Sequence, residues 1–299
     1  MKTHKLVLLA AFVAFSYVAC AQDYAFKVLA NKGNNEIKSG DSWQPLKTGA
    51  SLKTGDEVRL SDNAYIGLVH NSGKPVELKA AGVHKVSSLE SQVGTGSSVL
   101  NKYTDFILSS NSAESQRNRM NATGAVHRDI TSAAPINLLL PDKEHSGVFN
   151  QTAIISWEAG AVSGPFVVTV MNMFEDVLTK EETPGNSFEI DLRESKYATE
   201  TAILIEVSLK ANPKQISKRH LLKKLSTAEV GKISAALEEM SPQLSDRNAM
   251  NELFLAGFYE QNELLIDAIY AYQQAIRLQP DVPTFKESYE EFLQRNKLK

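Results

Sequence analysis

The stretch LFLAGFYEQNELLIDAIYAYQQAIRLQP, residues 253–280, decides the fold of the C-terminal third of this 299-residue chain. Apolar residues recur in it at helical spacing, which predicts two helices at about 247–260 and 263–278. Small, aromatic and helix-ending residues follow one another at Ala256, Tyr259, Ala268, Tyr272, Ala275 and Pro280. The alanines would let two antiparallel helices approach closely, the tyrosines would fill the gaps between them, and the proline would end the second helix.

These six positions resemble, in type and in register, the signature of the tetratricopeptide repeat, a helix–turn–helix unit of about 34 residues. A single repeat of this kind cannot bury its own faces, because the family's stability comes from stacked neighbours. We therefore expect flanking helices to cap it. The resemblance implies a structural tail or a docking surface in preference to a peptide-binding groove, which needs several stacked repeats.

Two further helices are predicted beside the repeat, at 226–240 and at about 284–296. The first opens on a capping box, in which Ser226 and Glu229 satisfy free amides at the helix start. Together these segments predict an all-α helical-repeat domain over 212–299. Within it we expect Gln273 to face solvent.

Upstream, residues 135–211 contain six candidate strands rich in Ile, Val, Thr and Phe, separated by turn-forming residues. About 75 residues of this pattern are typical of an immunoglobulin-like or fibronectin-III-like β-sandwich. Trp157 ends one apolar strand and is interpreted as a core residue between the two sheets.

Residues 22–108 form a third predicted unit. Short strands broken by glycines fill 24–84, which indicates an all-β module. Apolar residues at helical spacing then predict one or two short helices within 86–108. The polar stretch 109–134 lacks apolar periodicity and is interpreted as a linker. The predicted fold class is thus multidomain, with β-rich N-terminal two thirds and an all-α C-terminal helical-repeat unit.

Part of the first unit, GDSWQPLKTGASLKTGDEVRLSDNAYIGLVH from Gly40, resembles the FecR-type domain. The positions that carry this resemblance are Trp43, Pro45, Leu46, Gly49, Leu52, Gly55 and Asp56. The match covers about residues 24–90. It implies a β-rich periplasmic fold with a protein- or glycan-binding character. The regulators of this family carry a cytoplasmic segment and an internal membrane helix, whereas this chain has a signal segment at its start.

That signal segment is residues 1–21. Lys2 and Lys5 form a basic end, and Leu6 to Phe15 form an apolar run that is too short to cross a bilayer. Cleavage after Ala21 would release a mature chain that begins at Gln22. Alternatively, the residues before Cys20 partly resemble a lipobox, in which Cys20 would become a lipidated N-terminus. We therefore expect a periplasmic or secreted protein, or an outer-membrane lipoprotein.

The charge of the mature chain argues against nucleic acid as a partner. Removing residues 1–21 takes away Lys2 and Lys5 and no acid, which leaves 30 basic residues against 35 acidic ones. Nucleic-acid binding requires a basic face. The one basic cluster, KRHLLKK at 218–224, is interpreted as a solvated helix start or linker. Lipidation at Cys20 is the only membrane contact that the sequence suggests.

Motifs that carry catalytic or metal chemistry are not evident in the sequence. The mature histidines, at 70, 84, 127, 145 and 220, do not have the spacing of metal ligands, and Cys20 is the only cysteine. No Gly-x-Ser-x-Gly elbow is present, and the glycines at 67 and 73 do not have phosphate-loop spacing. We expect no catalytic, cofactor-binding or metal-binding residues and no cofactor.

Two functions follow as hypotheses. The first is a non-catalytic binding or scaffold protein of a bacterial cell envelope, with a protein or glycan partner. The second is an accessory subunit of an envelope signalling or transport system related to the FecR-type regulators.

Export predicts a defined N-terminus. N-terminal sequencing of the chain recovered from the envelope fraction should begin at Gln22, or be blocked because Cys20 is acylated. Recovery of the chain from the cytoplasm with Met1 intact would contradict export.

Overall fold

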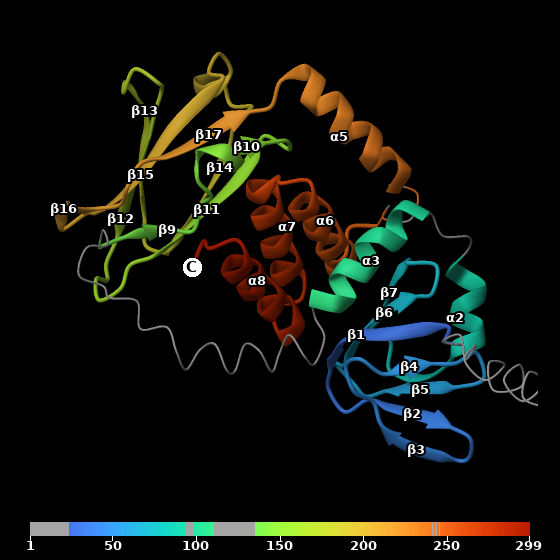
Figure 1. The fold of residues 1–299 in the computed structure, drawn as a ribbon. Helices are drawn as coiled ribbons and strands as arrows, with labels where there is room; N and C mark the ends of the chain where they lie inside the picture. The colour runs from blue at the N-terminus through green and yellow to red at the C-terminus, as the bar shows by residue number, and fades with distance from the viewer. Residues whose placement is uncertain (1–23, 94–97, 111–134, 241, 243, 245) are drawn as a thin grey trace, which may run out of the picture.

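A computed structural model describes residues 24–93, 98–110, 135–240, 242, 244 and 246–299. The predicted signal segment 1–21, with Cys20, and almost all of the predicted linker 109–134 lie outside the described residues. The N-terminal two thirds contain four β-sheets and the C-terminal third is helical, as the sequence predicts (Figure 1).

Residues 24–93 form the N-terminal β module. One antiparallel sheet has the order β4-β1-β6-β7 and the other β3-β2-β5-β8. The strands are β1 (Phe26–Lys32), β2 (Glu36–Ser39), β3 (Ser42–Pro45), β4 (Ser51–Leu52), β5 (Glu57–Leu60), β6 (Tyr65–His70), β7 (Pro75–Leu78) and β8 (Gly82–Lys85). Helices α2 (Val86–Val93) and α3 (Ser98–Ser110) follow, and they confirm the short helices predicted after the strands.

Strand β6 is buried on both faces. Ile66 and Leu68 belong to the core of the N-terminal module, whereas Tyr65 and Val69 belong to the larger core shared with the C-terminal helices. Between them, a Cβ atom at Gly67 would lie 2.5 Å from the Sδ atom of Met250, which belongs to helix α6 (Ala249–Gln261). The absence of a side chain at Gly67 therefore leaves room for Met250. A strand buried on both faces is apolar along its whole length, which explains the unbroken run YIGLV.

Residues 135–225 form the second β module. Its larger sheet has the order β10-β17-β15-β12-β13, with β16 paired to β15, and its smaller sheet has the order β14-β11-β9. The strands are β9 (Asn137–Leu138), β10 (Gly147–Val148), β11 (Thr152–Glu158), β12 (Phe166–Met171), β13 (Val177–Thr183), β14 (Ser187–Asp191), β15 (Ala202–Leu209), β16 (Asn212–Ile216) and β17 (His220–Lys224). Short 3-10 turns lie at η2 (Lys143–His145) and η3 (Ser195–Tyr197).

The two sheets of the second module share a core. In β15 every second side chain is buried, from Ile203 to Leu209, as expected for a strand with one inward face. Trp157 of the smaller sheet packs edge-on against Phe166 of the larger one, with ring centroids 5.4 Å apart, and is 3% exposed. Trp157 is therefore the core residue that the sequence analysis predicts.

The strands β16 and β17 correct the predicted boundary at 212. Residues 212–224, including the basic cluster 218–224, continue the larger sheet and are not part of the helical unit. The physical reason is the free edge of β15, whose backbone groups require partners that β17 supplies. Leu222 also adds a fully buried side chain to the shared core.

The remaining helices lie close to their predicted ranges. They are α5 (Thr227–Met240), α6 (Ala249–Gln261), α7 (Leu265–Leu278) and α8 (Pro283–Arg295). The capping box forms at the start of α5, where the Ser226 amide donates to Glu229 Oε2 at 2.8 Å. We call α6, α7 and α8 the helical unit.

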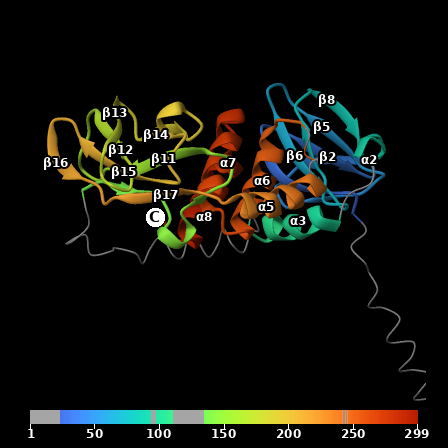
Figure 2. The same ribbon diagram turned by 90° about the horizontal axis from the view of Figure 1, so that it is seen from above.

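The helical unit lies between the two β modules (Figures 1 and 2). Helix α6 meets β7, α8 meets β1, and α7 meets β10 and β11. Phe285 of α8 contacts Tyr65 of the N-terminal module edge-on, with ring centroids 5.9 Å apart. The buried apolar residues of the second module and of the helices form one continuous core, which Leu29, Ala30, Tyr65 and Val69 of the N-terminal module join. The other buried apolar residues of the N-terminal strands form a separate core. The helical unit is thus an internal spacer and not a free tail.

Helix α3, from the end of the N-terminal region, covers one side of α6. Tyr103 and Phe258 pack edge-on with ring centroids 5.3 Å apart, and Ile107 lies 3.1 Å from where a Cβ of Gly257 would be. The sequence analysis expected the helix at 226–240 and the last helix to cap the repeat. The close packing on Gly257 shows that α3 provides a cap from more than 140 residues upstream.

Packing at Ala268 gives a test of the helical unit. Ala268 is fully buried, so Ala268→Leu should lower the unfolding free energy of the mature chain by about 1–3 kcal/mol through overpacking. The matched control is Ala235→Leu on the exposed side of α5, which should change it by less than about 0.5 kcal/mol. Thermal and urea unfolding of the full mature chain would measure both. Equal losses in the two variants would contradict close packing at Ala268.

Candidate functional site

The polar contacts between the helical unit and the β modules are the candidate site, because they hold buried titratable side chains. At the first junction, Glu77 of β7 accepts hydrogen bonds from the Tyr65 hydroxyl at 2.8 Å and from the backbone N–H of Met250 at 3.0 Å. A carboxylate suits the free amides and positive dipole end at the start of α6. Burial, and then the Glu77 charge, raise the pKa of Tyr65 well above its ordinary value.

At the second junction, Asp267 of α7 is fully buried. Its two carboxylate oxygens accept the backbone N–H groups of Phe149 and Asn150, each at 2.8 Å. Burial raises the pKa of Asp267 to about 6, although these donors act in the opposite direction. Asp267 therefore fixes α7 against the loop between β10 and β11.

Tyr259, one of the tetratricopeptide-like signature residues, also serves this junction. Its hydroxyl accepts a hydrogen bond from Asn150 Nδ2 at 2.9 Å, and its ring packs against Phe149 with centroids 6.2 Å apart. Burial raises its pKa well above the ordinary value of tyrosine. This signature residue therefore binds the second β module as well as filling the space between helices.

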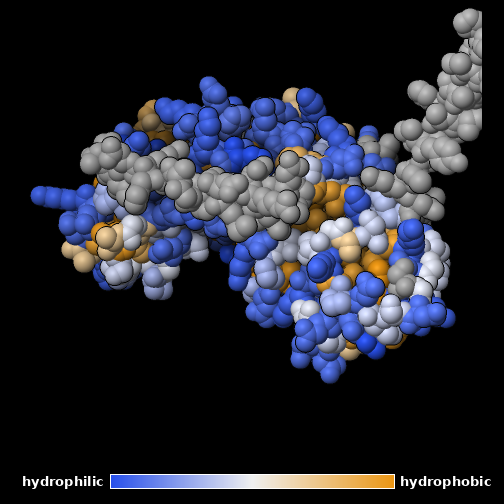
Figure 3. All heavy atoms as spheres, turned by 60° about the horizontal axis from the view of Figure 1, so that its bottom comes forward, coloured by the Kyte–Doolittle hydropathy of each residue, from blue (hydrophilic) through white to orange (hydrophobic). Residues whose placement is uncertain are grey.

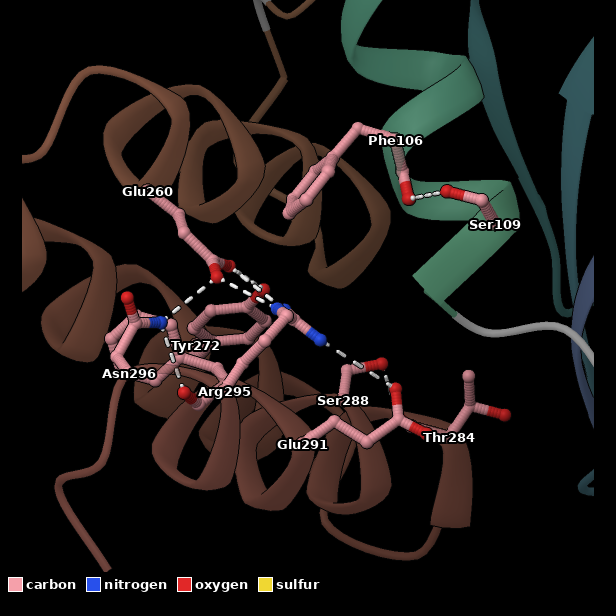
Figure 4. A network of polar contacts seen from close by, with 10 residues as sticks. Phe106, Ser109, Glu260, Tyr272, Thr284, Ser288, Glu291, Arg295 and Asn296 are labelled. Carbon is pink, nitrogen blue, oxygen red and sulfur yellow. Dashed lines mark hydrogen bonds and ion pairs between the residues drawn. The ribbon is translucent and has the colours of Figure 1, made fainter. Parts of the chain in front are cut away.

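Tyr272, the second signature tyrosine, lies in a network that closes the helical unit (Figure 4). Its hydroxyl donates to Glu260 Oε2 at 3.1 Å, and both Glu260 oxygens accept from the Arg295 guanidinium at 2.9 and 3.0 Å. The Arg295 guanidinium carbon also lies 5.4 Å from the ring centroid of Phe106 in α3. The network joins α6, α7, α8 and α3, so its hydrogen bonds, its ion pair and the contact of Arg295 with Phe106 hold these four helices together.

The other signature residues are placed by packing. Ala256, Ala268 and Ala275 are fully buried where α6, α7 and their neighbours meet, and Pro280 follows the end of α7. Gln273 is the exception to the predicted pattern. It does not face solvent freely, because its amide donates to Ser156 Oγ of β11 at 2.8 Å and to the Tyr289 hydroxyl at 3.1 Å. The second β module covers the helix face that an isolated repeat would expose.

The FecR-like signature residues divide between the core and an outer face. Leu46 and Leu52 are buried, Gly49 has a positive φ of 86°, and Asp56 accepts the Lys53 amide at 2.7 Å. These residues shape turns and packing, as does Gly55 at an exposed turn.

Trp43 and Pro45, the other two, lie in the outermost strand of the second N-terminal sheet. The Arg59 guanidinium carbon stacks 4.4 Å from the Trp43 ring centroid and pairs with Glu36. This group is half-exposed, so a partner could reach the Trp43 ring.

Candidate catalytic groups do not converge in the part of the chain that the structure describes. His70 contacts Ser72, His84 contacts the Ala80 carbonyl, and His145 lies 3.8 Å from Glu263. No group of three or more His, Cys, Asp or Glu side chains there could hold a metal ion.

One cavity of about 260 Å³ lies where β7, the end of α2 and the start of α6 meet. Three of the polar side chains that line it have partners within the chain. Lys74 donates to the Val93 carbonyl, Glu77 accepts from Met250, and Asn251 donates to the Asp246 carbonyl. The cavity is thus a seam between the N-terminal module and α6.

The residues that build the junctions, Glu77, Asn150 and Asp267, were not identified from the sequence. One signal was present for Asp267, which stands in the apolar run LLIDAI and so on a face that must be buried. Glu77 and Asn150 lie far from their partners in the chain, and local pattern does not reveal such pairs.

No known protein family matches the chain, and no curated protein matches it in sequence. Among the described helices, none is long and apolar enough to span a membrane.

Titration of Asp267 predicts a pH-dependent stability. Because its folded pKa is raised, the native state binds a proton more tightly than the unfolded state between about pH 4 and pH 6. Its contribution should therefore be largest in acid and fall on the order of 3 kcal/mol as pH rises through this window. Asp267→Asn does not titrate, so the stability difference, wild type minus variant, should shrink from pH 4 to pH 7 in urea unfolding.

The matched control is Asp281→Asn, because Asp281 is 76% exposed and pairs only at the surface with Lys32. This variant should follow the wild-type profile. A wild-type advantage over Asp267→Asn that grows as pH rises would show that the two N–H donors outweigh burial.

Proposed function

We propose that the mature chain is an exported, non-catalytic binding or scaffold protein of a bacterial cell envelope, which engages a protein or a glycan. In this proposal the N-terminal module is FecR-like, the second module is an immunoglobulin- or fibronectin-III-like sandwich, and the helical unit is tetratricopeptide-like. The observation that carries the proposal is the burial of the helical unit between two β modules.

That burial determines which surfaces remain for a partner. Helix α3 covers α6, and the second β module contacts α6 through Tyr259. The same module contacts α7 through Asp267 and Gln273. Peptide binding in stacked helical repeats uses an extended open face. The faces that would form it are occupied here, so the helices act as a spacer that holds two β modules in a fixed relation.

The outer surfaces of the β modules remain accessible. The Trp43–Arg59–Glu36 group lies on the outer sheet of the N-terminal module. Aromatic and arginine side chains are enriched where proteins contact their partners. Outside the residues drawn in grey, the face in Figure 3 shows hydrophilic residues over most of its area, with hydrophobic residues between them, which fits a chain that contacts partners through limited patches.

The buried polar groups support a non-catalytic role. Glu77, Asp267 and Glu260 each accept hydrogen bonds from backbone or side-chain donors that hold the helices in place. A general acid or base needs access to a substrate. These carboxylates are instead committed to contacts between elements.

Formaldehyde crosslinking of intact cells that carry the tagged chain would test the proposal. The expected result is a reproducible set of envelope proteins or glycans joined to the chain in the envelope fraction. The matched control lacks residues 1–21 and should stay in the cytoplasm, so these adducts should be absent. Recovery of the same adducts with the control, or of no adducts with the exported chain, would contradict the proposal.

A further inference from the structure

The turn between β12 and β13 exposes an apolar tip. Phe174 is 87% exposed, Met173 51% and Val177 58%. These are three of the five large hydrophobic side chains that are exposed in the described residues, and they lie within five positions of one another. Single exposed apolar residues are common on protein surfaces, but a contiguous group is typical of a contact site. We call residues 172–177 the hairpin tip, which projects from the end of the second β module in Figure 1.

The hairpin tip is held in one conformation by its own hydrogen bonds. Asn172 Oδ1 accepts the backbone N–H groups of Phe174 and Asp176, each at 2.9 Å. Asn172 Nδ2 donates to the Asp176 carboxylate at 3.0 Å, and the backbone N–H of Asn172 donates to the backbone carbonyl of Asp176 at 3.0 Å. Glu175 adopts a positive φ of 71°, a backbone conformation that non-glycine residues rarely adopt. The turn is therefore fixed by these hydrogen bonds, although its apolar side chains have few packing contacts with the rest of the protein.

Arg219 anchors this turn to the sheet. Its guanidinium pairs with Glu175 at 2.8 Å and with Glu206 of β15 at 2.9 Å. An apolar tip that is already ordered loses less conformational entropy on binding than a loose loop would. The geometry therefore favours a recognition element.

The edge of β13 offers a different mode of contact, strand addition, but its chemistry opposes that mode. Strand β13 ends the larger sheet, and its residues Lys180, Glu181 and Glu182 are exposed and charged. Glu181 and Glu182 pair with Lys196 and Lys210. Charged side chains on an edge strand discourage pairing with another chain. Contact is therefore expected at the tip and not along the edge.

The charges beside the apolar residues indicate the kind of partner. Glu175, Asp176 and Glu206 lie at or beside the tip, and Arg219 pairs with Glu175 and Glu206. Loops that insert into membranes pair apolar residues with basic ones, which are attracted to anionic lipids. An acidic margin is complementary to a basic rim.

We propose that the hairpin tip inserts Phe174 and Met173 into an apolar pocket of a partner protein whose rim carries Lys or Arg side chains. This inference rests on the proposed binding function and assigns one contact surface to it. Glu175 and Asp176 supply the complementary charge.

Site-specific photocrosslinking in cells tests the inference on the full exported chain. Phe174 is replaced by p-benzoylphenylalanine, and the matched control carries the same residue in place of Val83, which is 53% exposed on β8 of the other module. The expected result is one discrete protein adduct from position 174 and none of that adduct from position 83. Adding Glu175→Lys to the probe-bearing chain should reduce the adduct at least about tenfold, because it reverses the charge that faces the basic rim.

Phe174→Ser supplies the folding check. Because Phe174 is largely exposed, this variant should keep the wild-type unfolding temperature and yet lose the partner in formaldehyde crosslinking. A clear fall in unfolding temperature would overturn the inference, since Phe174 would then be a packing residue.

The remaining outcomes separate this inference from the proposed function. Adducts from position 174 only to lipid, only to a second copy of the chain, or unaffected by Glu175→Lys would overturn the inference. Partners captured by formaldehyde but not from position 174 would leave the binding function standing and reject the hairpin tip as its site. Failure of both crosslinking experiments would reject both.

Discussion

Helices α6 and α7 carry apolar residues on several faces, and such a pair of helices cannot be stable alone in water. The rest of the structure depends on this constraint. Helices α6 and α7 carry buried side chains all round, among them Phe254, Phe258 and Ile269. In repeat proteins, neighbouring repeats cover such faces. Here α3, α8 and the two β modules cover them, and one core therefore runs from the N-terminal sheet to the second module.

Two carboxylates determine how the helices sit against the modules. Apolar contact is non-directional, whereas Glu77 and Asp267 accept backbone N–H groups at defined positions. A shift of α7 by one turn would take the Asp267 carboxylate away from the backbone amides of Phe149 and Asn150. A buried amide left without an acceptor costs about 1–3 kcal/mol. These polar contacts thus give specificity to a junction whose stability comes mainly from burial.

A spacer of this kind has a consequence for function. Because the helices hold the two modules together, the proposed binding function assigns partner contacts to the outer surfaces of the β modules. In this proposal Trp43 with Arg59 marks one such surface on the N-terminal module, and the ordered tip at Phe174 marks another on the second module. A chain that holds two surfaces in a fixed relation is suited to bridging partners, which is the sense in which we propose a scaffold.

The sequence by itself determined the elements whose signals are local. The 3.6-residue period located α5 to α8, alternation located β15, and the Ser226–Glu229 box located the start of α5. Only the tertiary structure decided that residues 220–224 of the basic cluster form a strand, that α3 caps α6 and that Gln273 is bound by Ser156. The physical reason is that each of these outcomes depends on contact with another segment of the chain. The local pattern of apolar and polar residues shows which side chains share one face of a helix or strand. It does not show which other segment packs against that face.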